Sequence, residues 1–314
     1  MGTPFYFSSS LIDEGLRLDE FLASRLGISR NQVKQRVSSL VVNGKPCKLS
    51  KKLVAGLSIS GILEPVPHTE LVPQDIELSV LYEDEFCIVI DKPQGLVVHP
   101  GAGNPEGTVA NALAYRYFSA GLEYEEEGFD DVDNLRPGIV HRLDKDTSGV
   151  LLAAKDKASQ EFFSSCFRER QVKKIYLAVV KGLPSAKNGT IEGWLRRSRS
   201  NRKKFILTEH DEGGKFSQSF YSVLSSYGRY SLVALYPHTG RTHQLRVHMA
   251  HIGCPILGDP LYSRVDSSFP DATLMLHAYR LTIPLPDKKR IASFRAPLPV
   301  RFKEVLRTLS ARYR

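Results

Sequence analysis

A polar stretch between two apolar segments carries the densest group of chemically active side chains in this sequence. It runs from His141 to Gly149 and places the carboxylate of Asp144 directly between cationic neighbours. Polar side chains on a loop between two strands are a usual setting for a functional site. The same residues also fit a plain β-turn, in which Asp144 or Asp146 bonds the backbone and Thr147-Ser148-Gly149 completes the bend. The residues alone leave both interpretations open.

A second polar stretch, Thr239 to His248, contains cations on a segment with helical periodicity. Leu245 and Met249 lie one helical turn apart and define an apolar face. His243 and Arg246 lie in the same turns as these apolar residues, so the pattern does not assign them to a solvent-exposed face.

Several common classes of site are excluded by spacing. The histidines His243, His248 and His251 do not follow an HxxxH pattern and no cysteine or acidic ligand motif accompanies them, so no metal is predicted. Neither a Walker A loop nor a GxSxG elbow is present. A hydrolase using His141 and Asp144 lacks a nucleophilic Ser or Cys placed with them. The four cysteines are far apart and form no CxxC pair, which fits a reducing compartment.

The elements around these stretches are mainly strands. Apolar runs bounded by turns predict strands over 76–81, 86–91, 138–143, 149–154, 174–181, 217–224, 230–236, 274–283 and 290–294. Helical patterns cover 156–170, with Asp156 as the cap, 242–251 and 299–310. Many strands with few interspersed helices predict an α+β fold with a mostly antiparallel sheet.

The N-terminal region is distinctly basic. Between Gly15 and Gly61 there are nine basic residues and two acidic ones. Two short helices are predicted there, the first closed by Gly27 and the second opened by a Ser29–Gln32 capping box. An Asn43-Gly44 turn then joins short strands. We therefore expect a small domain over 13–64, a proline-containing linker over 65–74 and a larger domain over 75–314.

Composition and charge narrow the class of protein further. The chain has 314 residues, 42% hydrophobic and 25% charged, as in an ordinary globular protein, and a net charge of +9. A basic balance favours an anionic partner, nucleic acid first. No apolar run approaches the ~20 residues that cross a bilayer, and residues 1–10 do not form a signal peptide, so a cytoplasmic protein is predicted. An acidic run, Glu123 to Asp133, is interpreted as a solvated loop, whereas a basic run, Arg196 to Lys204, is interpreted as an RNA contact.

The basic N-terminal region resembles the S4 RNA-binding module over about 45 residues. The resemblance rests on Arg17-Leu18-Asp19, Ser29-Arg30, Val41-Val42-Asn43-Gly44 and Ala55-Gly56. It implies that this region grips RNA. The candidate RNA-binding residues, here and in the basic run, are Arg17, Arg30, Lys34, Arg36, Arg197 and Lys203.

The two chemical stretches, read with others, resemble the RluA-type family of pseudouridine synthases over about residues 80 to 297. The matching motifs are Lys92 to Pro100, His141 to Gly149, Lys174-Ile175-Tyr176, Gly240 to Arg246, Gly253 to Tyr262 and Leu276-His277-Ala278. The resemblance implies an isomerase that converts uridine to pseudouridine in structured RNA, with 23S ribosomal RNA as the expected substrate. The alternatives are the same isomerase acting on tRNA, and a catalytically silent RNA-binding or ribosome-assembly factor.

The resemblance also implies roles for individual residues. Asp144 would be the nucleophile, Tyr176 would stack on the uracil, and Arg246 would meet Asp144 through a planar pair of donors and keep it ionised. Arg142 would fill the gap left by the flipped nucleotide. The remaining candidate substrate-binding residues are His141, Leu245, Arg241 and His243. No cofactor and no metal is implied, RNA is the expected partner, and no obligate protein partner is evident.

Overall fold

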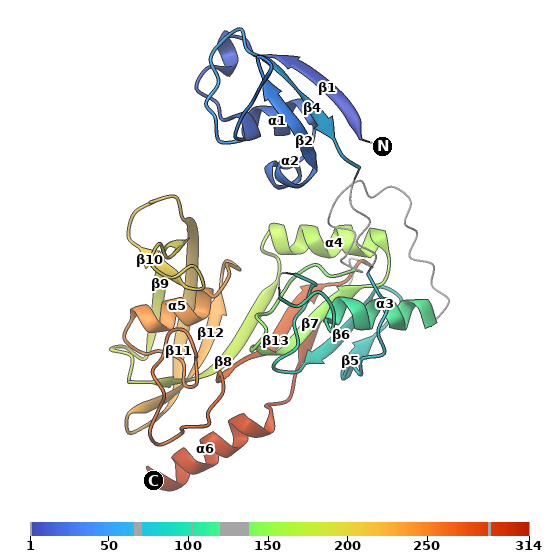
Figure 1. The fold of residues 1–314 in the computed structure, drawn as a ribbon. Helices are drawn as coiled ribbons and strands as arrows, with labels where there is room; N and C mark the ends of the chain where they lie inside the picture. The colour runs from blue at the N-terminus through green and yellow to red at the C-terminus, as the bar shows by residue number, and fades with distance from the viewer. Residues whose placement is uncertain (1, 66–70, 102, 120–137, 288–289, 314) are drawn as a thin grey trace. The chain divides into compact units, whose positions relative to one another are not determined.

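The structure, a computed structural model, describes residues 2–65, 71–101, 103–119, 138–287 and 290–313 (Figure 1). These residues form two compact units, an N-terminal unit up to residue 65 and a second unit from residue 71 onward. The acidic run Glu123 to Asp133 lies outside the described residues, as does part of the predicted linker, 66–70.

The N-terminal unit packs two helices on one antiparallel sheet. Its elements are β1 (Thr3–Ser8), η1 (Leu11–Asp13), α1 (Leu18–Leu26), α2 (Arg30–Arg36), β2 (Val37–Val42), β3 (Lys45–Pro46) and β4 (Ser58–Leu63), with strand order β1-β4-β2-β3. The two predicted helices are present. Gly27 closes α1 at a φ of 68°, and Ser29 and Gln32 bond each other's backbone at the start of α2. β1 was not predicted, and it supplies Phe5 to the core of this unit.

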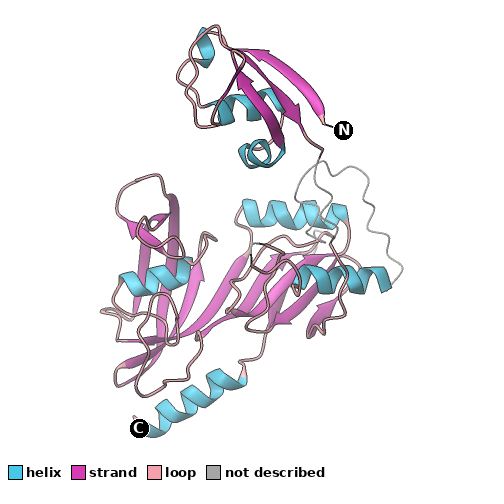
Figure 2. Ribbon diagram, in the orientation of Figure 1, coloured by secondary structure: helices cyan, strands magenta, loops and turns pink. Residues whose placement is uncertain are grey.

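The second unit is organised around one large sheet, seen in Figure 2 as the run of magenta arrows. Its ten strands lie in the order β10-β9-β11-β12-β8-β13-β7-β6-β5, with β14 paired to β13. Of the pairings between these strands only β13 with β7 is parallel. The predicted α+β class with a mostly antiparallel sheet is confirmed. The strands are β5 (Val80–Glu83), β6 (Cys87–Lys92), β7 (Ser148–Ala154), β8 (Lys173–Lys181), β9 (Asn188–Arg197), β10 (Phe205–Thr208), β11 (Lys215–Tyr227), β12 (Tyr230–Pro237), β13 (Leu276–Pro284) and β14 (Ile291–Arg295).

The helices of this unit within the described residues are α3 (Val109–Ser119), α4 (Lys157–Arg168), α5 (Gln244–His251) and α6 (Val300–Arg312), and they cover the sheet. Alternate residues of β6 enter different cores, because successive side chains of a strand point to opposite faces. Val89 packs in the same cluster as Phe163 of α4, whereas Ile88 packs with Leu113 of α3. A third cluster joins α5 and α6 to the β8, β11 and β12 half of the sheet. None of the described helices is both long and apolar enough to cross a membrane.

The prediction of a strand over residues 138–143 was wrong. Only Ile139 pairs, through an isolated bridge to Ala153. Beside it, the Ala154 amide donates to the Gly138 carbonyl, and after Ile139 the segment leaves the edge of β7, while Ile139 and Leu143 stay buried in the cluster that includes α3. The segment that carries Asp144 is therefore a loop lying over the sheet.

Other elements of the structure also differ from the predicted ones. The strand predicted over 76–81 is shorter and later, Val80–Glu83, because it extends only where β6 lies opposite it. β9, β10 and α3 were not predicted. The basic run begins at the end of β9 and finishes just before β10, so it forms the connection of a β-hairpin.

Candidate active site

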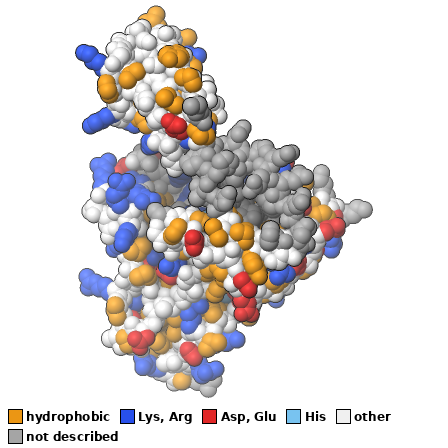
Figure 3. Space-filling view, turned by 45° about the vertical axis from the view of Figure 1, so that its right-hand side comes forward, with side chains coloured by type: hydrophobic (Ala, Val, Ile, Leu, Met, Phe, Trp, Pro, Cys, Tyr) orange, Lys and Arg blue, Asp and Glu red, His pale blue; other side chains and the backbone are white. Residues whose placement is uncertain are grey.

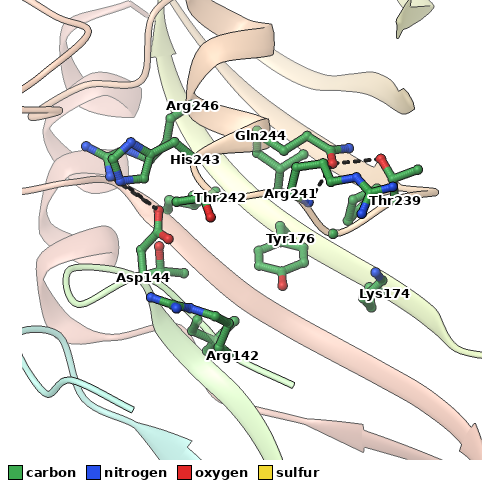
Figure 4. A pocket seen from close by; sticks show the side chains of 16 residues that line it. Arg142, Asp144, Lys174, Tyr176, Thr239, Arg241, Thr242, His243, Gln244 and Arg246 are labelled. Atoms are coloured by element: carbon green, nitrogen blue, oxygen red, sulfur yellow. Dashed lines mark hydrogen bonds and ion pairs between the residues drawn. The ribbon is translucent and has the colours of Figure 1, made fainter. Parts of the chain in front are cut away.

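A cavity in the second unit brings together the two polar stretches singled out in the sequence (Figure 4). Its walls come from the loop before β7, the start of β8, the connection between β12 and α5, the first turns of α5, and β13. The lining residues are Arg142, Leu143, Asp144, Thr147, Lys174, Tyr176, Pro237, Thr239, Gly240, Arg241, Thr242, His243, Gln244, Leu245, Arg246 and Leu276.

The loop of Asp144 is held through its backbone. Lys92 is fully buried, and its ammonium donates hydrogen bonds to the carbonyl oxygens of Pro93, Leu96 and Lys145. The amide of Gly95 donates a fourth bond, to the same carbonyl of Lys145. These bonds fix the peptide between Lys145 and Asp146 through its backbone, so the side chain of Asp144, one residue earlier, is left available to the cavity.

A glycine closes this loop against the neighbouring strand. Gly149 has a φ of 114°, in the region that favours glycine, and a Cβ there would lie 2.2 Å from the carbonyl oxygen of Ala278 in β13. The absence of a side chain lets β7 and β13 approach at this point. Asp144, on one side of the junction, is thereby brought near the residues of the other side.

Arg246 of α5 meets Asp144, as expected, although they lie 102 positions apart: its Nη1 donates to Oδ2 of Asp144 at 3.2 Å. The expectation that a planar pair of donors would face Asp144 was wrong. Nε and Nη2 of Arg246 donate instead to the two carboxylate oxygens of Asp259, at 2.8 and 2.9 Å. Burial opposes the charge of Arg246, but the hydrogen bonds and charges of both carboxylates raise its pKa above the usual value.

Asp259 explains why the pair of donors turns away from the nucleophile candidate. Its side chain is completely buried, and one oxygen also accepts the amides of Leu261 and Tyr262. A buried carboxylate is costly unless it is paired and hydrogen-bonded, so it takes the bidentate contact. Asp144, with a fifth of its side chain exposed, receives a single bond from the same guanidinium.

Tyr176 and Lys174 come from the start of β8 and, two residues apart, lie on the same face of that strand. In Figure 4 the ring of Tyr176 lies between Asp144 and Lys174. Burial and the nearby charge of Asp144 raise the pKa of Tyr176 well above its usual value. Burial alone lowers the pKa of Lys174 to about 8. The cavity thus has an aromatic floor with a carboxylate at one end and an ammonium at the other.

The turn before α5 is fixed by the side chain of Gln244. Its Oε1 accepts bonds from the Thr239 hydroxyl and from the amide of Arg241, at 2.7 and 3.0 Å. His243 precedes the helix with a φ of 56°, and its Nδ1 lies 2.9 Å from the Tyr262 hydroxyl. Its Nε2 lies 3.9 Å from Asp144, whose charge opposes the lowering of the His243 pKa by burial.

The other predicted substrate-binding residues are placed differently. Arg142 and Arg241 line the cavity and are exposed, and Leu245 is a buried part of its wall. His141 does not line the cavity. Its Nε2 accepts the amide of Leu152, its ring stacks on Phe167, and burial lowers its pKa to about 3. These contacts give His141 a packing role beside the site.

The candidate RNA-binding residues lie on both units, and Figure 3 shows Lys and Arg side chains projecting from the surface of each. In the N-terminal unit Arg17 and Arg30 both bond Asp19, Arg36 donates to the carbonyl of Glu64, and Lys34 is exposed on α2. In the second unit Arg197 ends β9 and its guanidinium lies over the ring of Phe205, while Lys203 is exposed in the hairpin connection.

Sequence reasoning did not assign a role to Lys92, Asp259 or Tyr262, although all three lie within the motifs of the resemblance. The available signal was a charged residue at the end of an apolar run, for Lys92, and an aspartate followed directly by proline, for Asp259. In the part of the chain that the structure describes, no cluster of three or more His, Cys, Asp or Glu side chains is arranged to hold a metal ion.

Comparison with known proteins connects this geometry to a family. Residues 86–251 match the family model described as RNA pseudouridylate synthase. The chain is 41% identical over 297 residues to Ribosomal large subunit pseudouridine synthase D of Borreliella burgdorferi, covering 92% of this chain and 88% of that relative. It is 36% identical over 315 residues to the protein of the same name from Haemophilus influenzae, covering 95% and 93%. Among solved structures, Human RNA Pseudouridylate Synthase Domain Containing 4 matches with a TM-score of 0.59 and 28% identity, over 74% of this chain and 93% of that one.

Proposed function

The chain belongs to the RNA pseudouridylate synthase family and is an isomerase acting on RNA, and on that premise we propose that the cavity around Asp144 is its active site and that large-subunit ribosomal RNA is its substrate. The observation that carries the site is the contact between Asp144 and Arg246, which places one partly exposed carboxylate beside a buried cation in a cavity with an aromatic floor.

Asp144 acts as the nucleophile. One carboxylate oxygen of Asp144 bonds C1′ of the bound uridine as the bond between C1′ and N1 breaks. The base then rotates, and C5 bonds C1′ as the bond between C1′ and Asp144 breaks, which returns the free carboxylate. The hydrogen on C5 is lost to solvent and N1 gains a proton, so the reaction is redox-neutral. The step needs an ionised carboxylate, and the incoming base displaces water from around it, which disfavours an unpaired charge. The adjacent guanidinium of Arg246 supplies the opposite charge and fixes one carboxylate oxygen, Oδ2, leaving Oδ1 for the attack.

Other side chains bind the flipped base and fill the space that the base leaves in the RNA helix. Tyr176 offers an aromatic face on which uracil can stack, close to the C5 proton that must leave. A base cannot be reworked inside a helix and must be flipped out. Arg142 is exposed at the mouth of the cavity, two residues from Asp144, and occupies the space that the flipped nucleotide vacates.

The ribosomal substrate is supported by the printed names of relatives that align with more than 90% of this chain. The N-terminal unit, which resembles an S4 module, acts as an RNA anchor through its exposed basic side chains, and the β9–β10 hairpin contacts RNA beside the site. A cytoplasmic location follows if ribosomal RNA is the substrate.

The variant Asp144→Asn tests the site. It should release no tritium above background from C5-tritiated uridine RNA, while its affinity for RNA stays within a few-fold of the wild type. Asp146→Asn is the matched control on the same loop, since Asp146 does not line the cavity, and it should retain activity. Turnover by Asp144→Asn would contradict the assignment of the nucleophile.

The substrate is tested separately. Unmodified transcripts of large-subunit ribosomal RNA and of tRNA are incubated with the enzyme, and pseudouridines are mapped by carbodiimide-dependent stops of reverse transcription. Stops are expected in the ribosomal transcript. Stops confined to tRNA would reassign the substrate without affecting the site.

A further inference from the structure

Three cations of the cavity have no anionic partner among the residues that the structure describes. Arg142, Lys174 and Arg241 line it, and none forms an ion pair with the residues that the structure describes. The charge of Arg246 is different, because it is already shared between Asp144 and Asp259. The cavity therefore carries positive charge that no carboxylate among the described residues balances.

Lys174 is the most constrained of the three. Arg142 and Arg241 are exposed, whereas Lys174 is only partly exposed, and burial lowers its pKa to about 8. Its ammonium has no hydrogen-bond acceptor among the described side chains and carbonyls, and its nitrogen still faces the open cavity. An anion that enters the cavity would supply the charged acceptor that the described residues do not.

The surroundings of Lys174 leave space for such an anion. The nearest atom to a Cβ built on Gly240 is Nζ of Lys174, at 3.8 Å, so the turn over the ammonium is open. Arg241 follows in the same turn, and its Nε donates to the carbonyl of Phe216, which leaves its two terminal nitrogens free. In Figure 4 Lys174 and Arg241 lie on the side of Tyr176 that is remote from Asp144.

We propose that Lys174 and Arg241 bind a phosphodiester group of the nucleotide whose base enters the cavity. This rests on the proposed function, since the base is taken to lie on Tyr176. Tyr176 and Lys174 are neighbours on one face of β8, about 7 Å apart along the strand, a spacing that one nucleotide can bridge from base to phosphate. Lys174 is thus a substrate-binding residue that fixes the sugar between the phosphate and Asp144.

The first experiment removes the charge of Lys174 and, separately, the charge of a single phosphate in the RNA. The probe is an unmodified fragment of the mapped transcript, made with ordinary phosphates or with one methylphosphonate 5′ or 3′ of the target uridine. Lys174→Met should bind ordinary RNA about tenfold more weakly than the wild type, since a hydrogen bond to a charged group is lost. One of the two methylphosphonates should weaken the wild type about tenfold and leave Lys174→Met unchanged. Lys174→Arg should retain most of the affinity and the sensitivity.

A second pair of variants tests whether a carboxylate on the protein competes with the RNA phosphate for Lys174. Gly240 does not have a positive φ, so other residues fit its backbone. Gly240→Asp places a carboxylate near Lys174 and should weaken RNA binding about tenfold relative to Gly240→Asn, which has the same shape and no charge. This comparison stands even if Lys174→Met fails to fold.

The outcomes separate the two proposals. If the wild type releases no tritium from any RNA, the proposed function fails. If the wild type is active but Lys174→Met binds with unchanged affinity, or responds to both methylphosphonates as the wild type does, the phosphate contact is wrong. Equal affinities for Gly240→Asp and Gly240→Asn would overturn it as well.

Discussion

A buried charge shared between two opposite charges occurs in each unit, and the arrangements around Asp19 and around Arg246 have opposite signs. In the N-terminal unit the buried member is a carboxylate: Asp19 is fully buried, and it accepts bonds from Arg17 at 3.0 Å and Arg30 at 2.9 Å, whose side chains are 40% and 45% exposed. In the second unit the buried member is a cation: Arg246, 4% exposed, is shared by Asp259 and Asp144.

The difference lies in what each arrangement presents to solvent. Around Asp19 the exposed partners are guanidiniums with several donors still free, which suits contact with RNA phosphates. Around Arg246 the exposed partner is a carboxylate with one hydrogen bond from the guanidinium and lone pairs to spare, which suits a nucleophile. Opposite orders of the same charges thus leave guanidiniums exposed at the proposed RNA anchor in one unit and a carboxylate exposed at the proposed nucleophile in the other.

Replacing the buried cation should give the largest effect. Arg246→Met fills similar space without charge, and we expect single-turnover isomerisation to fall about 100- to 1000-fold, as when a preorganised donor is removed from an active site. RNA affinity should change little, because Arg246 is buried. Arg246→Lys should be intermediate, because it keeps a charge but cannot bond Asp259 in a bidentate manner. A wild-type rate for Arg246→Met across a series of pH values would show that the pair does not serve the reaction.

Replacing the buried carboxylate of the other unit should affect stability and leave the chemistry intact. Asp19→Asn loses the charge-assisted bonds to Arg17 and Arg30, at a cost of about 1–3 kcal/mol in the free energy of unfolding of that unit. Hydrogen exchange of α1 reports this change. Trp194, the single tryptophan, lies in β9 and its fluorescence transition in urea serves as an internal control that should not move. Glu20→Gln, at the half-exposed partner of Arg30, should cost about 0.5 kcal/mol or less. Unchanged exchange in Asp19→Asn would show that burial of Asp19 contributes nothing.

Mild acid should distinguish the units by a smaller effect. Burial lowers the pKa of His141 to about 3, and of His248 and His277 to about 4. Between pH 6.5 and about 4 the unfolded chain therefore binds protons that the folded unit does not, and the free energy of unfolding falls as pH falls, by at most about 1.4 kcal/mol per pH unit for each histidine.

The N-terminal unit should not share this sensitivity. Its residues 2–65 contain no histidine, and hydrogen bonding from Arg17 holds the pKa of Asp19 at about 2, so its contribution is lost only below pH 3.8. Urea melts followed by Trp194 at pH 7, 6 and 5 measure the slope, and His277→Gln should reduce it. If the free energy of unfolding changes with pH equally in the wild type and in His277→Gln, protonation of His277 in the unfolded chain is not a source of the acid sensitivity.

Local sequence patterns were sufficient to predict elements whose structure depends mainly on their own residues. α4 was predicted from Asp156 as a cap and from aromatic residues at helical spacing, and the cap is present. The segment 138–143 was mispredicted because an apolar run indicates burial, and a loop packed on a sheet buries such residues as well as a strand does: Ile139 and Leu143 are buried in one cluster with α3 outside any strand. The contact between Asp144 and Arg246 spans 102 positions and came from the family resemblance, since periodicity carries no information at that range. Asp259 could not be predicted, because its importance depends on burial beside a residue of another element.

The short parallel junction between β7 and β13 has a mechanical consequence. Only two register pairs join these strands, at Ser148 and Gly149, so the large sheet is two half-sheets meeting along a narrow seam. Asp144 precedes β7 on one side of the junction, α5 with Arg246 packs on the other, and Tyr176 of β8 packs against the clusters of both. The close approach of β7 and β13 at Gly149 therefore helps to set the distance from the Asp144 carboxylate to the Arg246 guanidinium. A side chain at position 149 would push the two strands apart and should weaken that contact, although position 149 touches neither charged group.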